Sequence, residues 1–171
     1  MARLWISIPL FALLTALCAQ ISVPMTPVPM TLQSFAVVLS GLVLGARGGA
    51  AAMGLYLLLG AVGLPVFSDG GSGVDALTGE TAGYLVAFPL AAGLAGTLSR
   101  RPALSGFIGM SGLAIGAHLL ILALGATWLA TGIGVEEALA VGFAPFLIGA
   151  IAKSLAAAGA ALALRPFLRP A

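Results

Sequence analysis

The sequence predicts an all-α polytopic membrane protein, a bundle of six transmembrane helices with both termini in the cytoplasm. Of its 171 residues, 61% are hydrophobic and only 7% are charged, whereas a soluble domain has about 25% charged residues. The mean hydropathy is +1.18. Gly, Pro and polar residues divide the chain into six apolar runs with no repeat or linker between them. We therefore expect a single transmembrane domain over residues 1–171.

We expect each of the six apolar runs to form a transmembrane span. A helix needs roughly 20 residues to cross a hydrocarbon core about 30 Å thick. The second and third runs are short, rising only about 20 and 22 Å. Short spans flanked by breakers leave irregular backbone at membrane depth, which is tolerated only around a cavity. We therefore expect the connections 22–31 and 65–82 to do more than join helices. In chain order the spans are 4–21, 32–44, 50–64, 83–98, 104–124 and 146–164.

The first run, preceded by Arg3, has the outline of a secretory signal peptide. Cleavage after Ala19 would place Leu17 at the −3 position, where a small residue is required. Leu17 before Cys18 also disagrees with a lipoprotein signal. We expect this run to stay in the protein as a transmembrane helix.

The charges separate by sign under this topology. Basic residues of short loops stay cytoplasmic, so the side that carries the arginines is inside. The acidic loops then face out, and we expect a multi-pass protein of the cell (inner) membrane. The arginines are Arg3, Arg47, Arg100, Arg101, Arg165 and Arg169, and the acidic residues are Asp69, Asp75, Glu80, Glu136 and Glu137.

Several kinds of site are missing from the sequence. No clustered basic face suggests a nucleic-acid partner. The single cysteine, Cys18, has no His, Asp or Glu around it that would complete a metal site. The only lysine follows Ala152, so there is no Walker A motif for ATP hydrolysis. We expect no metal, no cofactor and no nucleic acid.

Lys153 is the one charged residue inside an apolar run. A charge at bilayer depth costs about 2.5–3.5 kcal/mol on insertion scales, so an intramembrane lysine indicates a functional site. It lies about 12 Å below the outer end of the last span. Its own helix offers no nearby carboxylate, and we expect it to face a cavity that binds an anion such as a carboxylate.

Aromatic and polar residues at the outer ends of the other spans would complete a small-molecule site, because such sites combine apolar walls with a few polar groups. For two of them, Tyr84 and Trp128, the alternative is a place in the interfacial aromatic belt. The candidates besides Lys153 are Gln33, Phe67, Thr81, Gly83, Tyr84 and Trp128.

His118 stands alone in the fifth span, without an HExxH motif or a paired carboxylate. We expect it to be buried and hydrogen-bonded. A hydrolytic triad would need an orienting acid at membrane depth, and every acid belongs to an outer loop. An intramembrane enzyme that uses His118 therefore remains only an alternative, and we expect no enzymatic activity.

Small residues recur one helical turn apart, as in Ala12 and Ala16 or Gly41 and Gly45. Such pairs allow helices to approach closely. For Ala12 and Ala16 two interpretations stay open: packing within the chain, and docking of the first helix onto another membrane subunit.

Three motifs resemble a known family. They are residues 60–67 (GAVGLPVF), 70–73 (GGSG) and 77–85 (LTGETAGYL). Together they resemble the signature of the BioY family, the biotin-specific S-components of energy-coupling-factor (ECF) transporters. The resemblance extends upstream to residues 28–33 and 41–45 and downstream to 128–130 and 145–153, close to the whole chain.

The resemblance implies a six-helix S-component that captures biotin outside the cell. It implies delivery inward together with a transmembrane coupling (T) protein and two ATPase subunits, and it favours docking for Ala12 and Ala16. One departure is Ala150, where the family usually has an aspartate within Pro-Gly-Asp; Lys153 thus lacks its usual neighbour. An S-component for another carboxylated vitamin stays an alternative, and the sequence does not decide whether Lys153 meets the carboxylate or the ureido group of biotin.

Overall fold

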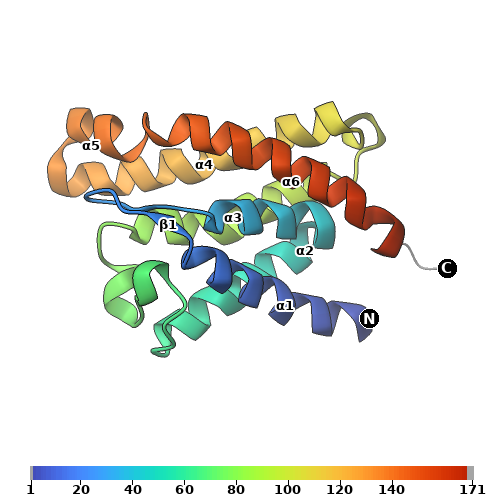
Figure 1. Ribbon diagram of the computed structural model, residues 1–171, viewed down its shortest axis with the longest axis horizontal. Coiled ribbons are helices and arrows are strands. Elements are labelled where there is room, and N and C mark those ends of the chain that lie inside the picture. The colour runs from blue at the N-terminus through green and yellow to red at the C-terminus, as the bar shows by residue number, and fades with distance from the viewer. Residues whose placement is uncertain (1, 169–171) are drawn as a thin grey trace.

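Six α-helices form an elongated bundle in the computed structural model, which describes the backbone of residues 2–168 and the side chains of residues 5–164 (Figure 1). Short β-strands and 3-10 turns occupy the connections. The all-α prediction is confirmed. The helices are α1 (Ala2–Ala19), α2 (Gln33–Ala61), α3 (Ala82–Leu98), α4 (Phe107–Ile133), α5 (Val135–Gly142) and α6 (Phe146–Leu168). The connecting elements are β1 (Ser22–Val23), β2 (Met30–Thr31), η1 (Ser68–Gly70), η2 (Val74–Leu77) and η3 (Pro102–Leu104).

Helix α2 consists of two halves that reverse direction at Gly45. This glycine has φ 79° and ψ 179°, a conformation that residues with a Cβ rarely adopt. A Cβ at Gly49 would lie 2.7 Å from the Cα of Gly41, two atoms that a continuous helix would hold roughly 12 Å apart. The two halves correspond to the expected spans 32–44 and 50–64, so the chain crosses the bundle six times.

The membrane assignment agrees with the helix lengths. By length and composition, α2, α4 and α6 are each long and apolar enough to cross a membrane, while the described part of α1 and the whole of α3 are shorter apolar helices. Because α2 folds back at Gly45, its halves measure about 18 and 24 Å. The protein is a multi-pass membrane protein whose short spans lie next to longer ones.

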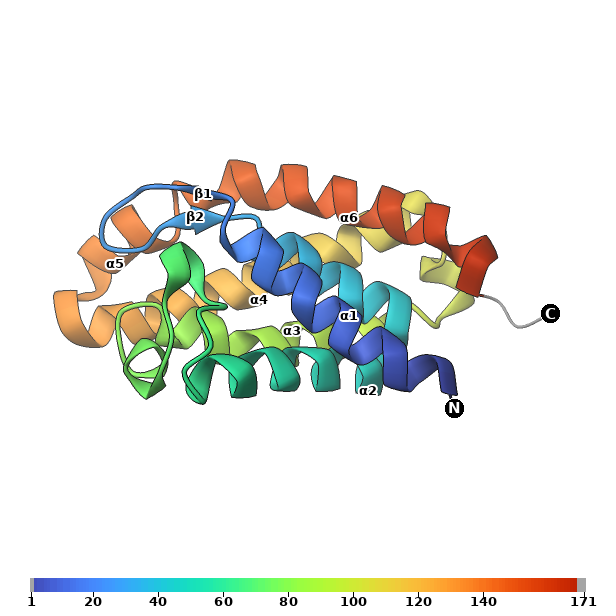
Figure 2. The same cartoon turned by 60° about the horizontal axis from the view of Figure 1, so that its bottom comes forward.

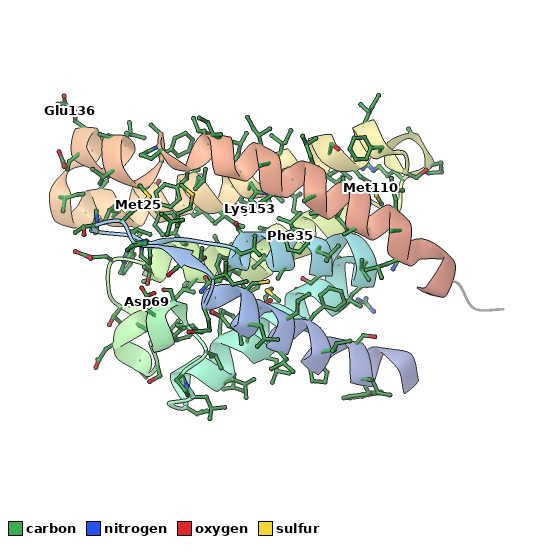
Figure 3. All side chains as sticks on the ribbon, viewed as in Figure 1. Met25, Phe35, Asp69, Met110, Glu136 and Lys153 are labelled. Atoms are coloured by element: carbon green, nitrogen blue, oxygen red, sulfur yellow. The ribbon has the colours of Figure 1, made fainter. Side chains whose placement is uncertain are left out.

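Charges of opposite sign lie at opposite ends of the bundle. The beginning of α1 and the end of α6 lie at one end, together with the turn after α3 (Figure 1). There a guanidinium nitrogen of Arg100 donates to the carbonyl of Leu44 at 3.4 Å. Asp69 and Glu136 lie at the other end (Figure 3). This separation matches the predicted topology. The side chains of Arg3 and Arg165, and the whole of Arg169, lie outside the described residues.

The outer end of α4 differs from the prediction. The helix continues past the expected end at residue 124 to Ile133, and the additional helix α5 follows it. Thr127 and Thr131 are polar residues within this extension, and each hydroxyl donates to a carbonyl of the same helix, to Ala123 at 2.7 Å and to Trp128 at 2.7 Å. The helix therefore continues without leaving these polar groups unpaired.

Small residues close the end of the bundle that carries the arginines. A Cβ at Gly41 would overlap the carbonyl of Ala92, and a Cβ at Gly96 would overlap the backbone of Gly45 and Ala46. The Gly41/Gly45 pair thus packs within this chain, against α3. Figure 2 shows the resulting arrangement, with α6 along one side and the second half of α2 along the other.

Candidate functional site

A cavity lies toward the acidic end of the bundle, where α2 begins and α3, α4 and α6 meet, with about 590 Å³ of empty space when the open solvent at its mouth is included. Residues of the β1–β2 connection and of η1 reach its edge, so both connections singled out in the sequence contribute to it. Its walls are mainly apolar, with Val28, Tyr84, Leu85, Phe88, Ile121 and Phe146. Its polar lining residues include Thr31, Gln33, Ser34, Thr81, His118 and Lys153.

Lys153 lines this cavity from α6 and is partly buried, as expected for an intramembrane lysine. Its Nζ donates to the backbone carbonyl of Thr31 at 3.0 Å. This bond joins α6 to strand β2 at the cavity edge. No Asp or Glu is among the described residues that line the cavity, so an anion entering it would find a cation without a competing carboxylate. Figure 3 shows Lys153 near the middle of the molecule.

His118 lies on α4 opposite the same part of α6. It is 2% exposed, and its Nδ1 lies 2.9 Å from the carbonyl oxygen of Ala114 and 2.9 Å from Oγ of Ser154. The prediction of a buried, hydrogen-bonded histidine is confirmed. The sequence interpretation did not place His118 in the cavity wall. Its position in the middle of α4, at the depth of Lys153 in a neighbouring helix, was the available signal.

Gln33 and Thr81 line the cavity as predicted. The amide nitrogen of Gln33 is buried and has no hydrogen-bond partner in the described part of the chain. A buried polar atom without a partner is uncommon in proteins and calls for an explanation. A bound ligand would provide that partner.

Tyr84 also lines the cavity, but its hydroxyl is already engaged. Its Oη donates to the carbonyl of Gly142 at 2.6 Å. Its ring lies 6.4 Å from that of Phe146, centroid to centroid. The ring of Tyr84 thus forms part of the cavity wall. Its hydroxyl hydrogen is bonded to the C-terminal residue of α5 and is not free for a ligand.

Phe67, Gly83 and Trp128 do not line the cavity. The ring of Phe67 is buried edge-on against Tyr56, with centroids 5.4 Å apart. Trp128 is 43% exposed, and its Nε1 donates to the carbonyl of Gly79 at 2.9 Å. A Cβ at Gly83 would overlap the Cβ of Trp128. The aromatic walls of the cavity are instead formed by Tyr84 together with Phe88 and Phe146, two residues that the sequence interpretation missed.

The two alanines expected to dock α1 onto a partner differ in burial. Ala12 is 1% exposed and belongs to the core of the bundle. It therefore offers little surface to a partner subunit in this structure. Ala16 is partly buried and packs at the edge of the same core. Docking through Ala12 and Ala16 therefore stays a prediction, with Ala16 the more accessible of the two.

The comparisons with known proteins agree with this geometry. The model of the BioY family matches residues 1–170. The probable biotin transporter BioY of Pyrococcus horikoshii is 40% identical over 152 residues, which cover 88% of this chain and 88% of that protein. The biotin transporter BioY of Thermotoga maritima is 40% identical over 160 residues, covering 91% of this chain and 92% of that protein.

A solved structure has the same fold. It is the crystal structure of the S-component for biotin from an ECF-type ABC transporter, which superposes with a TM-score of 0.88 at 22% sequence identity. The superposition covers 96% of this chain and 92% of that chain. At this identity the likeness establishes the S-component fold.

Proposed function

The chain belongs to the BioY family, and on that basis we propose that it is the substrate-capture subunit of a biotin uptake transporter. The observation that carries the proposal is the cavity, which combines the cation of Lys153 with apolar walls and unpaired neutral polar groups. The opening lies at the acidic end of the bundle, which the positive-inside rule places outside the cell. Substrate would therefore enter from outside.

Biotin has three parts that such a cavity complements: an apolar thioether bicycle, a neutral ureido group and a valerate carboxylate. Tyr84, Phe88 and Phe146 offer the aromatic walls for the bicycle. Lys153 provides the charge, for the carboxylate or for the ureido oxygen. The neutral hydrogen bonds come from Gln33 and Thr81, which are both on the cavity wall.

Phe67, Gly83 and Trp128 act indirectly in this proposal. Gln20 donates through its amide nitrogen to the carbonyl of Phe67 at 3.0 Å, which holds the segment before Ser68 on the end of α1. Trp128 holds the loop that leads to Thr81 through its bond to Gly79, and Gly83 allows α3 to approach Trp128 closely. These contacts position the loops that border the cavity.

The partners proposed are a transmembrane coupling (T) protein and two ATPase subunits, in the cell (inner) membrane. The chain itself has no Walker A motif, so energy must come from another subunit. On α1, Leu13 lies three residues before Ala16 and Leu17 directly follows it, and both leucines are exposed. This part of α1 is the proposed contact with the T protein.

Two alternatives carry less support. An S-component for another carboxylated vitamin would share the lysine and the fold. However, the two relatives named above are described as a probable biotin transporter and a biotin transporter. An intramembrane enzyme would use His118 as a base, yet among the described residues no acid lines the cavity to orient it. Membership in a transporter family favours transport.

Direct binding of radiolabelled biotin to the purified protein in lipid nanodiscs tests the proposal. We expect saturable binding to one site per chain and displacement by unlabelled biotin. Nicotinate, which shares only the carboxylate with biotin, should displace it poorly. Lipoate, which also has a valerate chain and a sulfur-containing ring but no ureido group, should displace it poorly as well. Absence of saturable binding, or equal displacement by these carboxylates, would contradict a biotin-specific site.

A further inference from the structure

The hydrogen bonds around His118 determine which ring nitrogen carries a hydrogen. The carbonyl oxygen of Ala114, 2.9 Å from Nδ1, can only accept. The hydroxyl of Ser154 donates its own hydrogen to the carbonyl of Ala150 at 2.7 Å, so its oxygen presents a lone pair to Nδ1. Both neighbours of Nδ1 are acceptors, and Nδ1 must therefore be the protonated nitrogen.

The other nitrogen, Nε2, then depends on the charge of the ring. Lys153 directly precedes Ser154 and lines the same cavity as His118. A second proton on the imidazole would place two cations next to each other in an apolar interior, where the repulsion is weakly screened. No Asp or Glu among the described lining residues compensates such a pair. The ring is therefore neutral, and Nε2 carries a lone pair.

This lone pair has no partner in the described part of the chain. Nε2 is buried, and neither a donor side chain nor a backbone N–H reaches it. An unsatisfied buried acceptor is costly. Because His118 lines the cavity, a donor on a bound molecule is the group that can reach Nε2 at that depth of the bundle.

We propose that Nε2 of His118 accepts a hydrogen bond from an N–H of the bound ligand and thereby selects a ligand with an amide-type or ureido N–H. The inference rests on the proposed function and adds an orientation to it. A carboxylate against Nε2 would bring lone pairs together. A ureido group instead combines N–H donors with an oxygen that Lys153 or the free amide of Gln33 can bind. Biotin would lie with its ureido ring against His118 and its carboxylate elsewhere in the cavity.

The test compares ligands first, in the wild-type protein. Binding is measured by isothermal titration calorimetry in nanodiscs for biotin and for biotin methylated at either ureido nitrogen. We expect one of the two methylated ligands to bind at least about ten- to one-hundred-fold more weakly than biotin, because it loses a hydrogen bond to a buried acceptor. If both methylated ligands bind as tightly as biotin, the inference is wrong, and this result requires no variant protein.

Variants of His118 then identify the acceptor. His118→Phe keeps a ring of similar size without Nε2, and we expect it to bind biotin about ten- to one-hundred-fold more weakly. The wild-type protein is expected to bind one methylated ligand more weakly than biotin. In His118→Phe this difference in affinity should largely disappear. His118→Gln, whose amide oxygen reaches about as far as Nε2, should recover most of the affinity and the preference. Thermal unfolding without ligand provides the folding control.

The outcomes separate the inference from the proposed function. If His118→Phe lowers the affinity for biotin and for both methylated ligands by the same factor, His118 contributes only to packing. The acceptor role is then overturned, while the proposal of biotin capture stands. If the wild-type protein binds no biotin, the proposed function fails and this inference fails with it. Rescue by His118→Gln together with a lost preference in His118→Phe supports the inference.

Discussion

The two ends of the bundle use the same helices in opposite ways. At the arginine end, Gly41 and Gly96 bring the backbones of α2 and α3 into direct contact. Ser99 at this end is satisfied locally, since its Oγ donates to the carbonyl of Gly96 at 3.2 Å, whereas the buried Oγ of Ser111, near the start of α4, has no partner in the described part of the chain. Toward the acidic end, aromatic side chains line a cavity between the helices, and Nε2 of Gln33 and Nε2 of His118 have no partner in the described part of the chain. Side-chain size along each helix thus separates a closed structural end from a hollow binding end.

We expect the largest loss of stability from a substitution at the closed end. Gly41→Leu places a side chain where the carbonyl of Ala92 already lies. We expect a destabilisation above the about 1–3 kcal/mol typical of overpacking, because the obstacle is backbone, and biotin binding should be lost with the fold. Gly112→Leu is the matched control, since Gly112 is exposed and nothing lies within 4 Å of an added Cβ. Thermal unfolding in detergent measures the stability of both variants. Equal stability of the two would contradict close packing at the arginine end.

At the hollow end, Lys153→Met should impair binding and leave folding intact. Truncating one partner of a buried charged hydrogen bond costs about 2–5 kcal/mol, which corresponds to roughly thirty-fold to several thousand-fold in affinity for biotin. The folded state should survive, because the change removes a charge from membrane depth. Ala152→Met is the control on the exposed face of the same helix. Near-normal affinity for biotin in a folded Lys153→Met protein would show that the lysine has a structural role and does not bind the ligand.

The surface of α1 is a third region, and we expect it to be used for assembly. Ala16→Trp should prevent co-purification with the T protein and leave biotin affinity within about threefold, because Ala16 lies at the edge of the core and away from the cavity lining. Ala12→Trp should instead destabilise the protein alone, since Ala12 is 1% exposed. Leu10→Trp, at an exposed position of the same helix, controls for bulk. Normal co-purification of Ala16→Trp would exclude this face as the docking site.

The smallest expected effect concerns which end is outside. In a Cys18→Ala background, single cysteines are introduced as Ser72→Cys and Arg101→Cys, both at exposed positions. A membrane-impermeant thiol reagent added outside should label position 72 and spare position 101, with biotin binding unchanged, since arginine-rich turns remain cytoplasmic. Labelling of position 101 from outside would invert the assignment of the two ends.

Features that depend on local composition could be predicted from the amino-acid sequence. Apolar runs and their breakers predicted the six crossings, including the reversal of α2 near Gly45, and the position of Lys153 within an apolar run predicted its place in a cavity. These inferences work because inserting a charge or an unpaired backbone group into lipid is costly wherever it occurs along the chain.

Which face of each helix points inward could not be predicted from the sequence. The sequence did not show that Ala12 is buried and that Trp128 lies outside the cavity, or that Phe88 and His118 line it. In a membrane the lipid is as apolar as the protein interior, so hydrophobicity does not distinguish the two faces of a helix. The rotation of each helix is set by close contacts between distant residues, such as Gly41 with Ala92 and His118 with Ser154, and these contacts exist only once the bundle has formed.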